Sequence, residues 1–253
     1  MIPVSVVIVT KDEERNIKDA LESVREFEEI VVLDAFSADG TVEICRRYTP
    51  RVFQQEWMGY ARQKQTAVNL AQKEWVLILD ADERVTPELK KELAGKIGEG
   101  THDGFYLPRK NFFLGRWIRH SGWWPDYTLR LFRKEISRVE YREVHEKVVV
   151  EGSVGYLKEP VEHYTYRTIA DYLRKMEQYS TLSANELYTK KKTPLLSMMV
   201  NPVAVFIKMF FLRQGFRDGM HGFILAGLYG CYTFLKYAKI WEKRRDDRGH
   251  GSI

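Results

Sequence analysis

The sequence is poor in the features that define several large classes of protein. Only two cysteines, Cys45 and Cys231, occur in 253 residues, so a disulfide framework is excluded. The short apolar run near the N-terminus follows no basic segment, which argues against a signal peptide and favours a reducing, cytosolic setting. With 44% hydrophobic and 30% charged residues, the chain is predicted to fold as one large domain, alone or with an appendage.

The sequence also lacks the roughly 20 uninterrupted apolar residues that a membrane-spanning helix needs. Two shorter apolar segments, 195–212 and 223–235, lie in a C-terminal region that carries 12 Lys and Arg against 5 Asp and Glu. Residues 1–185 carry 28 against 30, so the whole basic excess belongs to residues 186–253. Basic and apolar character together predict amphipathic helices lying on an anionic membrane surface. Packing against the preceding domain, or a homo-oligomer interface, is the alternative.

Short apolar runs alternate with helical patterns over the first 80 residues. Residues 4–9 are apolar at nearly every position, which is typical of a parallel strand buried on both faces. Further strands are predicted at 30–33, 52–53 and 75–79, and helices at 12–24, 41–48 and 61–71. This alternation predicts an α/β fold with a doubly wound, mostly parallel sheet.

The pattern changes after residue 104. β-prone aromatic segments are predicted at 105–107, 129–132 and 147–150, and a helix is predicted from 169 to about 190. Residues 111–127 are too irregular for one element and are expected to form a loop over a cleft. We therefore expect a catalytic domain at 1–185, with a nucleotide-binding half at 1–100 and an acceptor half at 101–185, followed by C-terminal helices at 186–253.

Polar residues follow three of the predicted strands. These segments are 10–13, 34–37 and 80–82, and ligands of an open α/β sheet bind beyond the carboxyl ends of its strands. Asp80 and Asp82, one residue apart after a buried strand, form a DXD motif of hard oxygen donors. Such a pair is suited to Mg²⁺ or Mn²⁺ carrying a diphosphate.

The runs VSVVIVTKDEERNI, VVLDAFSADGT and ARQKQTAVNLAQKEWVLILDADE resemble the nucleotide-binding half of family 2 glycosyltransferases with the GT-A fold. Further on, GWWPDYTLRLFRK, VHEKV, EHYTYRTIADYLRKMEQY and GFRDGMHG resemble the lipopolysaccharide inner-core glucosyltransferase subgroup. The resemblance covers nearly the whole chain. It implies transfer of a hexose from a nucleotide-sugar, with inversion at the anomeric carbon.

The resemblance also implies roles for individual residues of the donor site. Thr10 and Glu13 would touch the nucleotide, Asp34 would hydrogen-bond the base, typically uracil, and Lys64 would lie near the diphosphate. Asp80 would hydrogen-bond the ribose, and Asp82 would ligate the metal. Because the two aspartates together form the DXD motif, Asp80 is also a candidate metal ligand. A late histidine completes the metal shell in some GT-A enzymes, and His163 and His145 are candidates, with a structural role as the alternative for each. Glu83 is either close to this motif or a solvated loop carboxylate.

An inverting transfer needs a general base for the acceptor hydroxyl. Asp126 is the predicted base because it precedes an Arg-bearing segment, as in the family, and Glu146 is the second candidate. Arg130 and Arg133 could neutralise the diphosphate leaving group, or form ion pairs on a strand.

Trp123 and Trp124 offer ring faces for an acceptor sugar, although aromatic pairs are also common in cores. The acceptor is expected to be a lipid-linked glycan such as lipopolysaccharide core, on the cytoplasmic face of the inner membrane. No nucleic acid partner is expected, because no binding motif accompanies the basic tail.

Three alternatives to this function remain open at the level of the sequence. A polyprenyl phosphate acceptor keeps the chemistry and changes the product. A sugar nucleotidyltransferase would need a Gly-rich loop after the first strand, and none follows residue 10. A non-catalytic membrane-binding protein is disfavoured by the retained acidic residues.

Overall fold

The computed structural model describes residues 1–140, 147–188 and 195–249. The chain packs as two compact units, of which unit 1 comprises Met1–Lys110 and Asp126–Tyr164, and unit 2 comprises Asn111–Pro125 and Thr165–Ile253. Helix α5 (Ile169–Tyr188) belongs to unit 2, because it packs against the C-terminal helix: Ser183 Oγ and Tyr232 Oη are 2.8 Å apart. The packing units therefore divide elsewhere than residue 185, and the functional boundary expected there stays a prediction.

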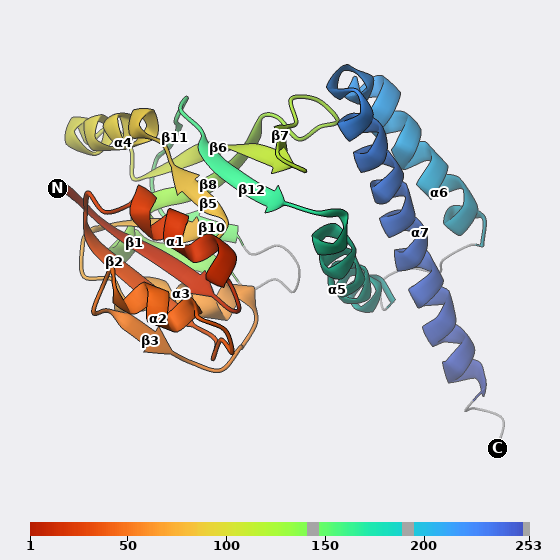
Figure 1. The fold of residues 1–253 in the computed structure, drawn as a ribbon, viewed down its shortest axis with the longest axis horizontal. Coiled ribbons are helices and arrows are strands. Elements are labelled where there is room, and N and C mark those ends of the chain that lie inside the picture. Colours follow the sequence, from red (N-terminus) through yellow and green to blue (C-terminus); the bar gives the residue numbers. More distant parts are fainter. Residues whose placement is uncertain (141–146, 189–194, 250–253) are drawn as a thin grey trace. The chain divides into compact units, whose positions relative to one another are not determined.

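Unit 1 is built on a large mixed sheet (Figure 1). The strand order is β3-β2-β1-β4-β8-β6-β12-β5, and β7 and β11 pair with β6. The first four of these are parallel, and β8 joins them antiparallel. The strands of the sheet are β1 (Ile2–Thr10), β2 (Phe27–Asp34), β3 (Val52–Gln54), β4 (Trp75–Asp80), β5 (Glu83–Val85), β6 (Gly104–Phe113), β7 (Arg116–Trp117), β8 (Asp126–Arg133), β11 (Val154–Tyr156) and β12 (Val161–Tyr166). A separate pair is formed by β9 (Ser137–Glu140) and β10 (Lys147–Val150).

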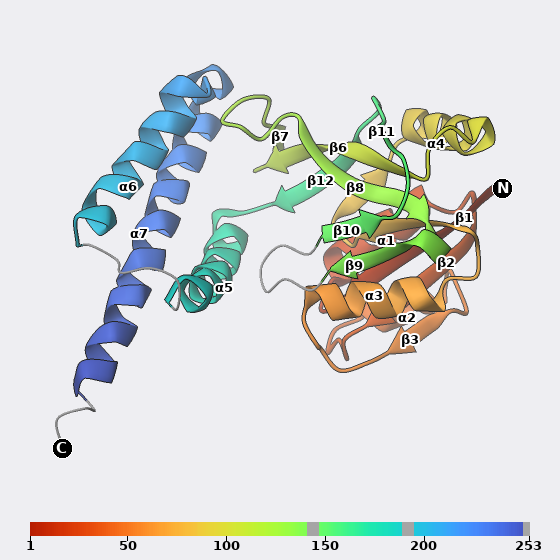
Figure 2. The ribbon, with the colours of Figure 1, turned by 180° about the vertical axis from the view of Figure 1, so that it is seen from behind.

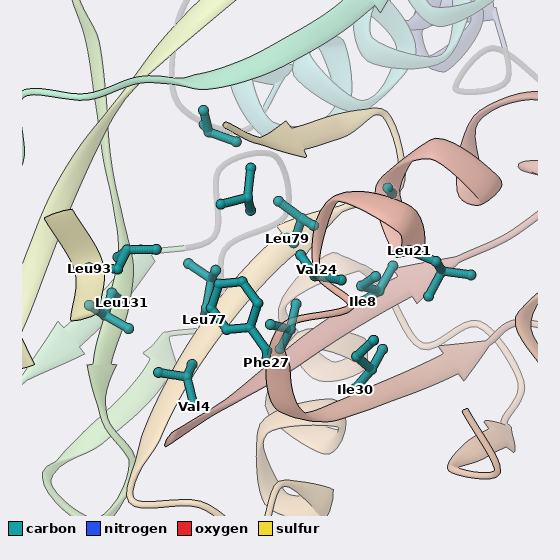
Figure 3. Packing of buried hydrophobic residues seen from close by; sticks show 14 of the residues in the cluster. Val4, Ile8, Leu21, Val24, Phe27, Ile30, Leu77, Leu79, Leu93 and Leu131 are labelled. Atoms are coloured by element: carbon teal, nitrogen blue, oxygen red, sulfur yellow. The ribbon is translucent and has the colours of Figure 1, made fainter. Parts of the chain in front are cut away.

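Helices cover both faces of the parallel strands. The helices are α1 (Glu14–Ser23), α2 (Thr41–Arg46), α3 (Tyr60–Leu70) and α4 (Pro87–Glu99). Side chains alternate along β1, so Val6 and Ile8 pack with α1, whereas Val7 packs with α3. Figure 3 shows the first of these two cores, where Ile8 and Leu21 lie close together. α1 and α3 lie on opposite faces (Figure 1 and Figure 2), so the doubly wound α/β arrangement is confirmed.

Residues 111–127 are not one irregular loop, and that expectation is corrected. The segment ends β6, forms β7 and begins β8, with a tight turn at Leu114 (φ 51°) and Gly115 (φ 78°) between β6 and β7. Two of the aromatic residues that made the segment look irregular are held in place because they are buried. Phe113 and Trp123 lie in the core of unit 2, with rings 6.2 Å apart and edge to face.

The C-terminal part of unit 2 is helical. α6 (Leu195–Ile207) continues into a π-helical segment, η2 (Lys208–Leu212), and a 3-10 turn, η3 (Gly215–Asp218), leads to α7 (Met220–Gly249). α6 and α7 run side by side in both views (Figure 1 and Figure 2). Among the described residues, Leu195–Leu212 is the one helical stretch long and apolar enough to cross a membrane by length and composition, and only 6% of it is buried.

Candidate active site

Three parallel strands of unit 1 end at the same edge of the sheet. Thr10, the last residue of β1, lies opposite Asp34, the last residue of β2. Val9 lies opposite Asp80, the last residue of β4. β8 runs antiparallel to β4 and therefore begins, at Asp126, toward the edge where β4 ends. The topology thus brings most of the predicted site residues to one edge of the sheet.

Asp80 is the centre of a charge cluster. Its Oδ1 lies 2.9 Å from Nζ of Lys64 on α3, and its Oδ2 lies 2.5 Å from Nη2 of Arg130 on β8. Both cations are more than nine-tenths buried. Glu83 is fully buried as well: its Oε1 lies 3.2 Å from Arg130 Nη2, and its Oε2 accepts a hydrogen bond from the backbone N–H of Asp80. Glu83 is therefore not a solvated loop carboxylate but an anchor for both Asp80 and Arg130.

Opposing effects set the charge of Asp80. Burial favours the neutral carboxyl and is the largest single effect, but attraction to Arg130 and Lys64 together outweighs it. The pKa of Asp80 is consequently held well below its usual value. Asp80 is therefore ionised at neutral pH, and its ion pairs hold Lys64 and Arg130 at the carboxyl end of β4.

Asp82 and His163 form the second pair at this edge. Asp82 Oδ1 and His163 Nε2 are 3.4 Å apart, and both side chains are largely buried. Strand β12 places the histidine, because His163 lies opposite Glu83 and the backbone N–H of Tyr164 donates to the carbonyl of Asp82. Among the described residues no group of three or more His, Cys, Asp or Glu side chains is arranged to hold a metal ion.

Two donors fit a divalent cation that takes its other ligands from substrate. Mg²⁺ is usually bound by one or two carboxylates together with substrate phosphates and water. Two ligands at right angles on such an ion are about 3 Å apart, close to the separation of Asp82 and His163. The carboxylate of Asp80, by contrast, already carries two cationic partners. Of the three described residues predicted to hold a metal, Asp82 and His163 are therefore the better candidates.

Asp34 and Thr10 lie side by side at the ends of β1 and β2. Asp34 is fully buried and accepts hydrogen bonds from the backbone N–H of Ser37 (2.9 Å), from Ser37 Oγ (2.5 Å) and from Gln54 Nε2 (3.2 Å). A carboxylate offers about four acceptor positions, so one remains for a ligand. Thr10 Oγ1 is buried and has no hydrogen-bond partner within the described ranges. A buried hydroxyl without a partner is costly, and a polar atom of a ligand would satisfy it.

The loops after β1 and β2 are tied to each other. The backbone N–H of Asp12 donates to Ser37 Oγ (2.8 Å), and Asp12 itself has a left-handed backbone (φ 54°). Glu13, expected to touch the nucleotide, accepts a hydrogen bond from Asn16 Nδ2 (2.8 Å) at the start of α1. Phe36 also has a left-handed backbone (φ 54°), and 56% of its surface is exposed. An exposed aromatic ring held in a strained conformation beside Asp34 is a candidate stacking surface for a planar base.

Asp126 is held by a cross-strand ion pair. Arg109 of β6 lies opposite Asp126 of β8, and Arg109 Nη2 is 2.6 Å from Asp126 Oδ2. The Asp126 side chain keeps 33% of its surface exposed. The guanidinium fixes one carboxylate oxygen, and the partial exposure leaves the group accessible to a substrate hydroxyl.

Arg133 does not join the other site residues. It lies opposite Trp75, at the start of β4, and forms ion pairs with Glu74 and with Asp103 (3.3 Å). Arg130 and Arg133 are three positions apart on one strand, so their side chains point to opposite faces and about 10 Å separates them along the strand. Of the two arginines expected at the leaving group, the structure brings only Arg130 to the carboxyl end of β4.

The two tryptophans expected to bind the acceptor differ in burial. Trp123 lies in the core of unit 2, where its Nε1 donates to Tyr229 Oη (3.2 Å), so its ring faces are not available to a sugar. Trp124 is half-buried and packs edge to face on Trp117, with ring centroids 5.4 Å apart. The second candidate base, Glu146, and the candidate ligand His145 lie outside the described residues.

Sequence reasoning missed Arg109 and Phe36. Nothing in the local sequence marks Arg109, because its partner Asp126 is set by the register of two antiparallel strands. Phe36 could have been noticed as a large apolar residue between Asp34 and Ser37, where a turn at the end of a strand would expose it.

Comparisons with known proteins identify the family of the chain. The family model described as glycosyl transferase family 2 matches residues 5–165, more than half of the chain. The chain is 29% identical to the lipopolysaccharide core biosynthesis glycosyltransferase LpsC of Rhizobium meliloti (strain 1021), over 96% of this chain and 93% of that protein. It is 28% identical to an uncharacterized glycosyltransferase of Rickettsia felis, over 96% and 90% of the two chains.

Solved structures share the fold. The mannosyltransferase PcManGT of Pyrobaculum calidifontis, in complex with GDP-Man and Mn²⁺, superposes with a TM-score of 0.51, at 16% identity, covering 94% of this chain and 87% of that one. S. aureus TarS 1–349 in complex with UDP-GlcNAc superposes with a TM-score of 0.50, at 16% identity, covering 96% and 92%. The architecture is thus the GT-A fold.

Proposed function

The chain belongs to glycosyl transferase family 2, and we propose on that basis that it transfers a hexose, such as glucose, from a UDP-linked donor to a membrane-anchored glycan, with inversion at the anomeric carbon. The observation that carries the proposal is the set of polar side chains gathered at one edge of the sheet. In this proposal Lys64 and Arg130 beside Asp80 would bind an anion, and Asp82 with His163 would bind a cation. Asp126 would supply the base.

The ends of β1 and β2 are proposed to bind the nucleotide. Thr10 has an unused buried hydroxyl, Asp34 has one free acceptor position, and Phe36 offers an exposed ring for the base. Glu13 lies at the start of α1 in the adjoining loop. TarS, which shares the fold, binds UDP-GlcNAc, and this supports a uridine donor.

The diphosphate is proposed to bind between the two charge pairs. Asp82 and His163 would hold Mg²⁺ or Mn²⁺, which when bound would neutralise charge on the diphosphate; the Mn²⁺ complex of PcManGT supports this. Lys64 and Arg130 add two fixed cations that are already in place before the donor arrives. Cations that need no rearrangement stabilise a developing leaving-group charge effectively. Asp80, which lies between Lys64 and Arg130, is proposed to accept a hydrogen bond from the ribose.

Asp126 is proposed as the general base. It would accept the proton of the acceptor hydroxyl as that oxygen bonds to the anomeric carbon, while the bond to the nucleoside diphosphate breaks on the opposite face. Arg109 orients the carboxylate of Asp126 through the ion pair to its Oδ2. Trp124 remains the proposed aromatic surface for the acceptor sugar.

A lipid-linked acceptor on the cytoplasmic face of the inner membrane accounts for the surface of α6. Exposed apolar side chains recur at three- and four-residue spacing along α6 and the η2 segment that continues it: Leu195, Leu196, Met199, Val200, Val203, Ile207, Phe211 and Leu212. Exposed Lys208, Arg213 and Arg217 accompany the stripe. An apolar face with basic neighbours is typical of a helix lying in an anionic membrane interface. The similarity to LpsC supports a lipopolysaccharide core acceptor.

The proposal is tested by transfer assays with UDP-, GDP-, ADP- and TDP-sugars and Mn²⁺, offered lipid A-core or polyprenyl phosphate. We expect product from a UDP-hexose and lipid A-core only, and loss of product with EDTA. Asp126→Asn should lower kcat at least a hundredfold while the Kd for the donor is unchanged. Asp103→Asn is the matched control at the other end of the sheet and should transfer normally.

Three outcomes would contradict parts of the proposal. Near-normal kcat of Asp126→Asn removes the base assignment. Product on polyprenyl phosphate alone changes the acceptor. No thermal shift and no product with any nucleotide-sugar contradict glycosyl transfer itself, while vesicle binding retained without any such activity would favour a purely membrane-binding protein.

A further inference from the structure

A second group of polar side chains lies within unit 2, where the segment after β7 meets η3. His120 Nδ1 lies 3.1 Å from Asp218 Oδ1. Asp218 is buried and also accepts hydrogen bonds from the backbone N–H groups of His120 (2.9 Å) and Arg119 (3.3 Å). A buried carboxylate therefore fixes both the backbone and the ring of His120.

This arrangement determines which ring nitrogen is available. A carboxylate only accepts hydrogen bonds, so Nδ1 of His120 must carry the proton that faces Asp218. Nε2 makes no hydrogen bond to any described residue, and the His120 side chain keeps 23% of its surface exposed. Asp218 orients the imidazole through Nδ1, so that Nε2 is left for a ligand. The same arrangement is found where a histidine binds substrate or metal.

The backbone beside His120 is strained. Ser121 has φ 59° and Gly122 has φ 81°, two left-handed residues in succession. The hydroxyl of Ser121 is buried and has no hydrogen-bond partner in the described part of the chain. Arg213 closes the turn: its carbonyl accepts from the backbone N–H of Ser121 (2.9 Å), and a Cβ on Gly122 would meet its guanidinium. Strained backbone and unsatisfied polar groups of this kind concentrate at functional sites.

The surroundings are strongly basic. Residues 111–125 and 208–222 hold five Lys and Arg but one acidic residue, Asp218, which is already engaged. Arg119 lies over the ring of Trp117 at 4.3 Å. Within the described residues, neither Arg119 nor Arg213 forms an ion pair. One of these guanidinium groups belongs to the residue next to His120 in the chain, and the other approaches Gly122. Two cations without a counter-ion among the described residues, close in the fold to an oriented imidazole, fit an anion.

We propose that His120, Arg119 and Arg213 bind a phosphate ester, with Asp218 as the residue that positions the imidazole. The ester belongs either to a phosphorylated sugar of the acceptor or to a phospholipid headgroup of the membrane that carries it. The inference rests on the proposed function for the identity of the acceptor, but the phosphate site itself is independent of it.

Two substitutions of His120 separate ligand binding from a structural role. In His120→Asn the amide nitrogen replaces Nδ1, so the contact with Asp218 is kept and Nε2 is lost. In His120→Gln the amide nitrogen replaces Nε2, so the ligand contact is kept and the bond to Asp218 is lost. We expect His120→Asn to raise the KM for deacylated, phosphorylated core oligosaccharide about tenfold, the loss typical of one charge-assisted hydrogen bond. The Tm of His120→Asn should match that of the parent chain. His120→Gln should instead lower the Tm and leave the KM close to that of the parent.

Controls identify the source of the phosphate. The same oligosaccharide after removal of its phosphates should show no difference between His120→Asn and the parent. Binding to phosphatidylglycerol vesicles is measured in parallel, and a tenfold weakening there alone assigns the site to the lipid headgroup. Arg213→Gln should weaken binding in the same assay in which His120→Asn does. His221→Asn, a half-buried histidine of α7, is the matched control and should change neither quantity.

A binding measurement that needs no sugar transfer tests the phosphate site even if the proposed function is wrong. Inorganic phosphate is titrated into the ¹⁵N-histidine-labelled protein with UDP present to occupy the donor site. A shift of the His120 ring signals that is absent in Arg213→Gln supports the site even if no sugar is transferred. The inference is overturned if phosphate leaves these signals unchanged and His120→Asn binds both oligosaccharide and vesicles as the parent does. In that case the contact between His120 and Asp218 only stabilises the fold.

Discussion

The charge cluster around Asp80 permits a quantitative prediction. Asp80→Asn keeps the volume of the side chain but leaves Lys64 and Arg130 buried with one carboxylate, Glu83, instead of two. Removing one partner of a buried ion pair costs about 3–5 kcal/mol. Because 29% of the Asp80 side chain is exposed and Glu83 still neutralises Arg130, we expect a loss of about 2–3 kcal/mol in the free energy of unfolding.

The pH dependence of this loss follows from the lowered pKa. A carboxyl whose pKa is lower in the folded chain than in the unfolded chain, where it is about 3.9, stabilises the fold fully above the unfolded value. That stabilisation disappears as the pH falls through the folded pKa. The difference between the parent and Asp80→Asn should therefore be constant from pH 8 to about pH 5 and shrink only below about pH 4.

Urea unfolding followed by circular dichroism and tryptophan fluorescence measures the effect. A cycle with Lys64→Met should show a coupling of about 1–2 kcal/mol between the two positions, because the lysine is costly only when its partner is missing. The matched control is Asp19→Asn, whose carboxylate is 63% exposed and 3.4 Å from Arg84. It should cost less than about 0.5 kcal/mol. The reasoning is refuted if Asp80→Asn is as stable as Asp19→Asn, or if its deficit already changes between pH 8 and pH 6.

Three further predictions concern other parts of the chain. Burial raises the pKa of Cys45 to about 12, so a thiol reagent at pH 8 should label exposed Cys231 rapidly and Cys45 only in urea; equal labelling rates would contradict this. Met199→Glu with Val203→Glu on α6 should abolish sedimentation with phosphatidylglycerol vesicles without changing the circular dichroism spectrum; a dimer in gel filtration that the same pair dissociates would instead identify an oligomer interface. Phe132→Ala, in the fully buried middle of the sheet, should cost about 3–5 kcal/mol in urea unfolding, and a cost below about 1 kcal/mol would contradict the packing.

The parallel half of the fold was predictable because its signals are local. Each strand from β1 to β4 is a short apolar run followed by polar residues, and each helix has its own apolar spacing. The prediction for residues 111–127 was wrong because the segment has no hydrophobic periodicity of its own. Its order comes from Phe113 and Trp123 packing with helices that follow more than 40 residues later.

The site was predictable to the extent that it depends on where strands end. Thr10, Asp34 and Asp80 each end a parallel strand, and this alone places them on one edge. Arg130 and Arg133 were treated alike, although the two-residue period of a strand already separates them. The pairing of Asp126 with Arg109 depends on an antiparallel register, and such a register is not encoded within either strand alone.

The core of unit 2 has a consequence for biosynthesis. Trp123 hydrogen-bonds Tyr229 across 106 positions of sequence, so the segment before β8 cannot be completed until the last helix has been made. At about 5–20 residues per second, the ribosome needs roughly 5–20 s to add those residues. Unit 1, which ends at Tyr164, is synthesised in full well before then, whereas α6 emerges with its apolar face uncovered and α7 still to come. The nascent chain thus exposes the apolar face of α6 before unit 2 has closed its core, and contact of that face with another apolar surface during synthesis would lower its tendency to aggregate.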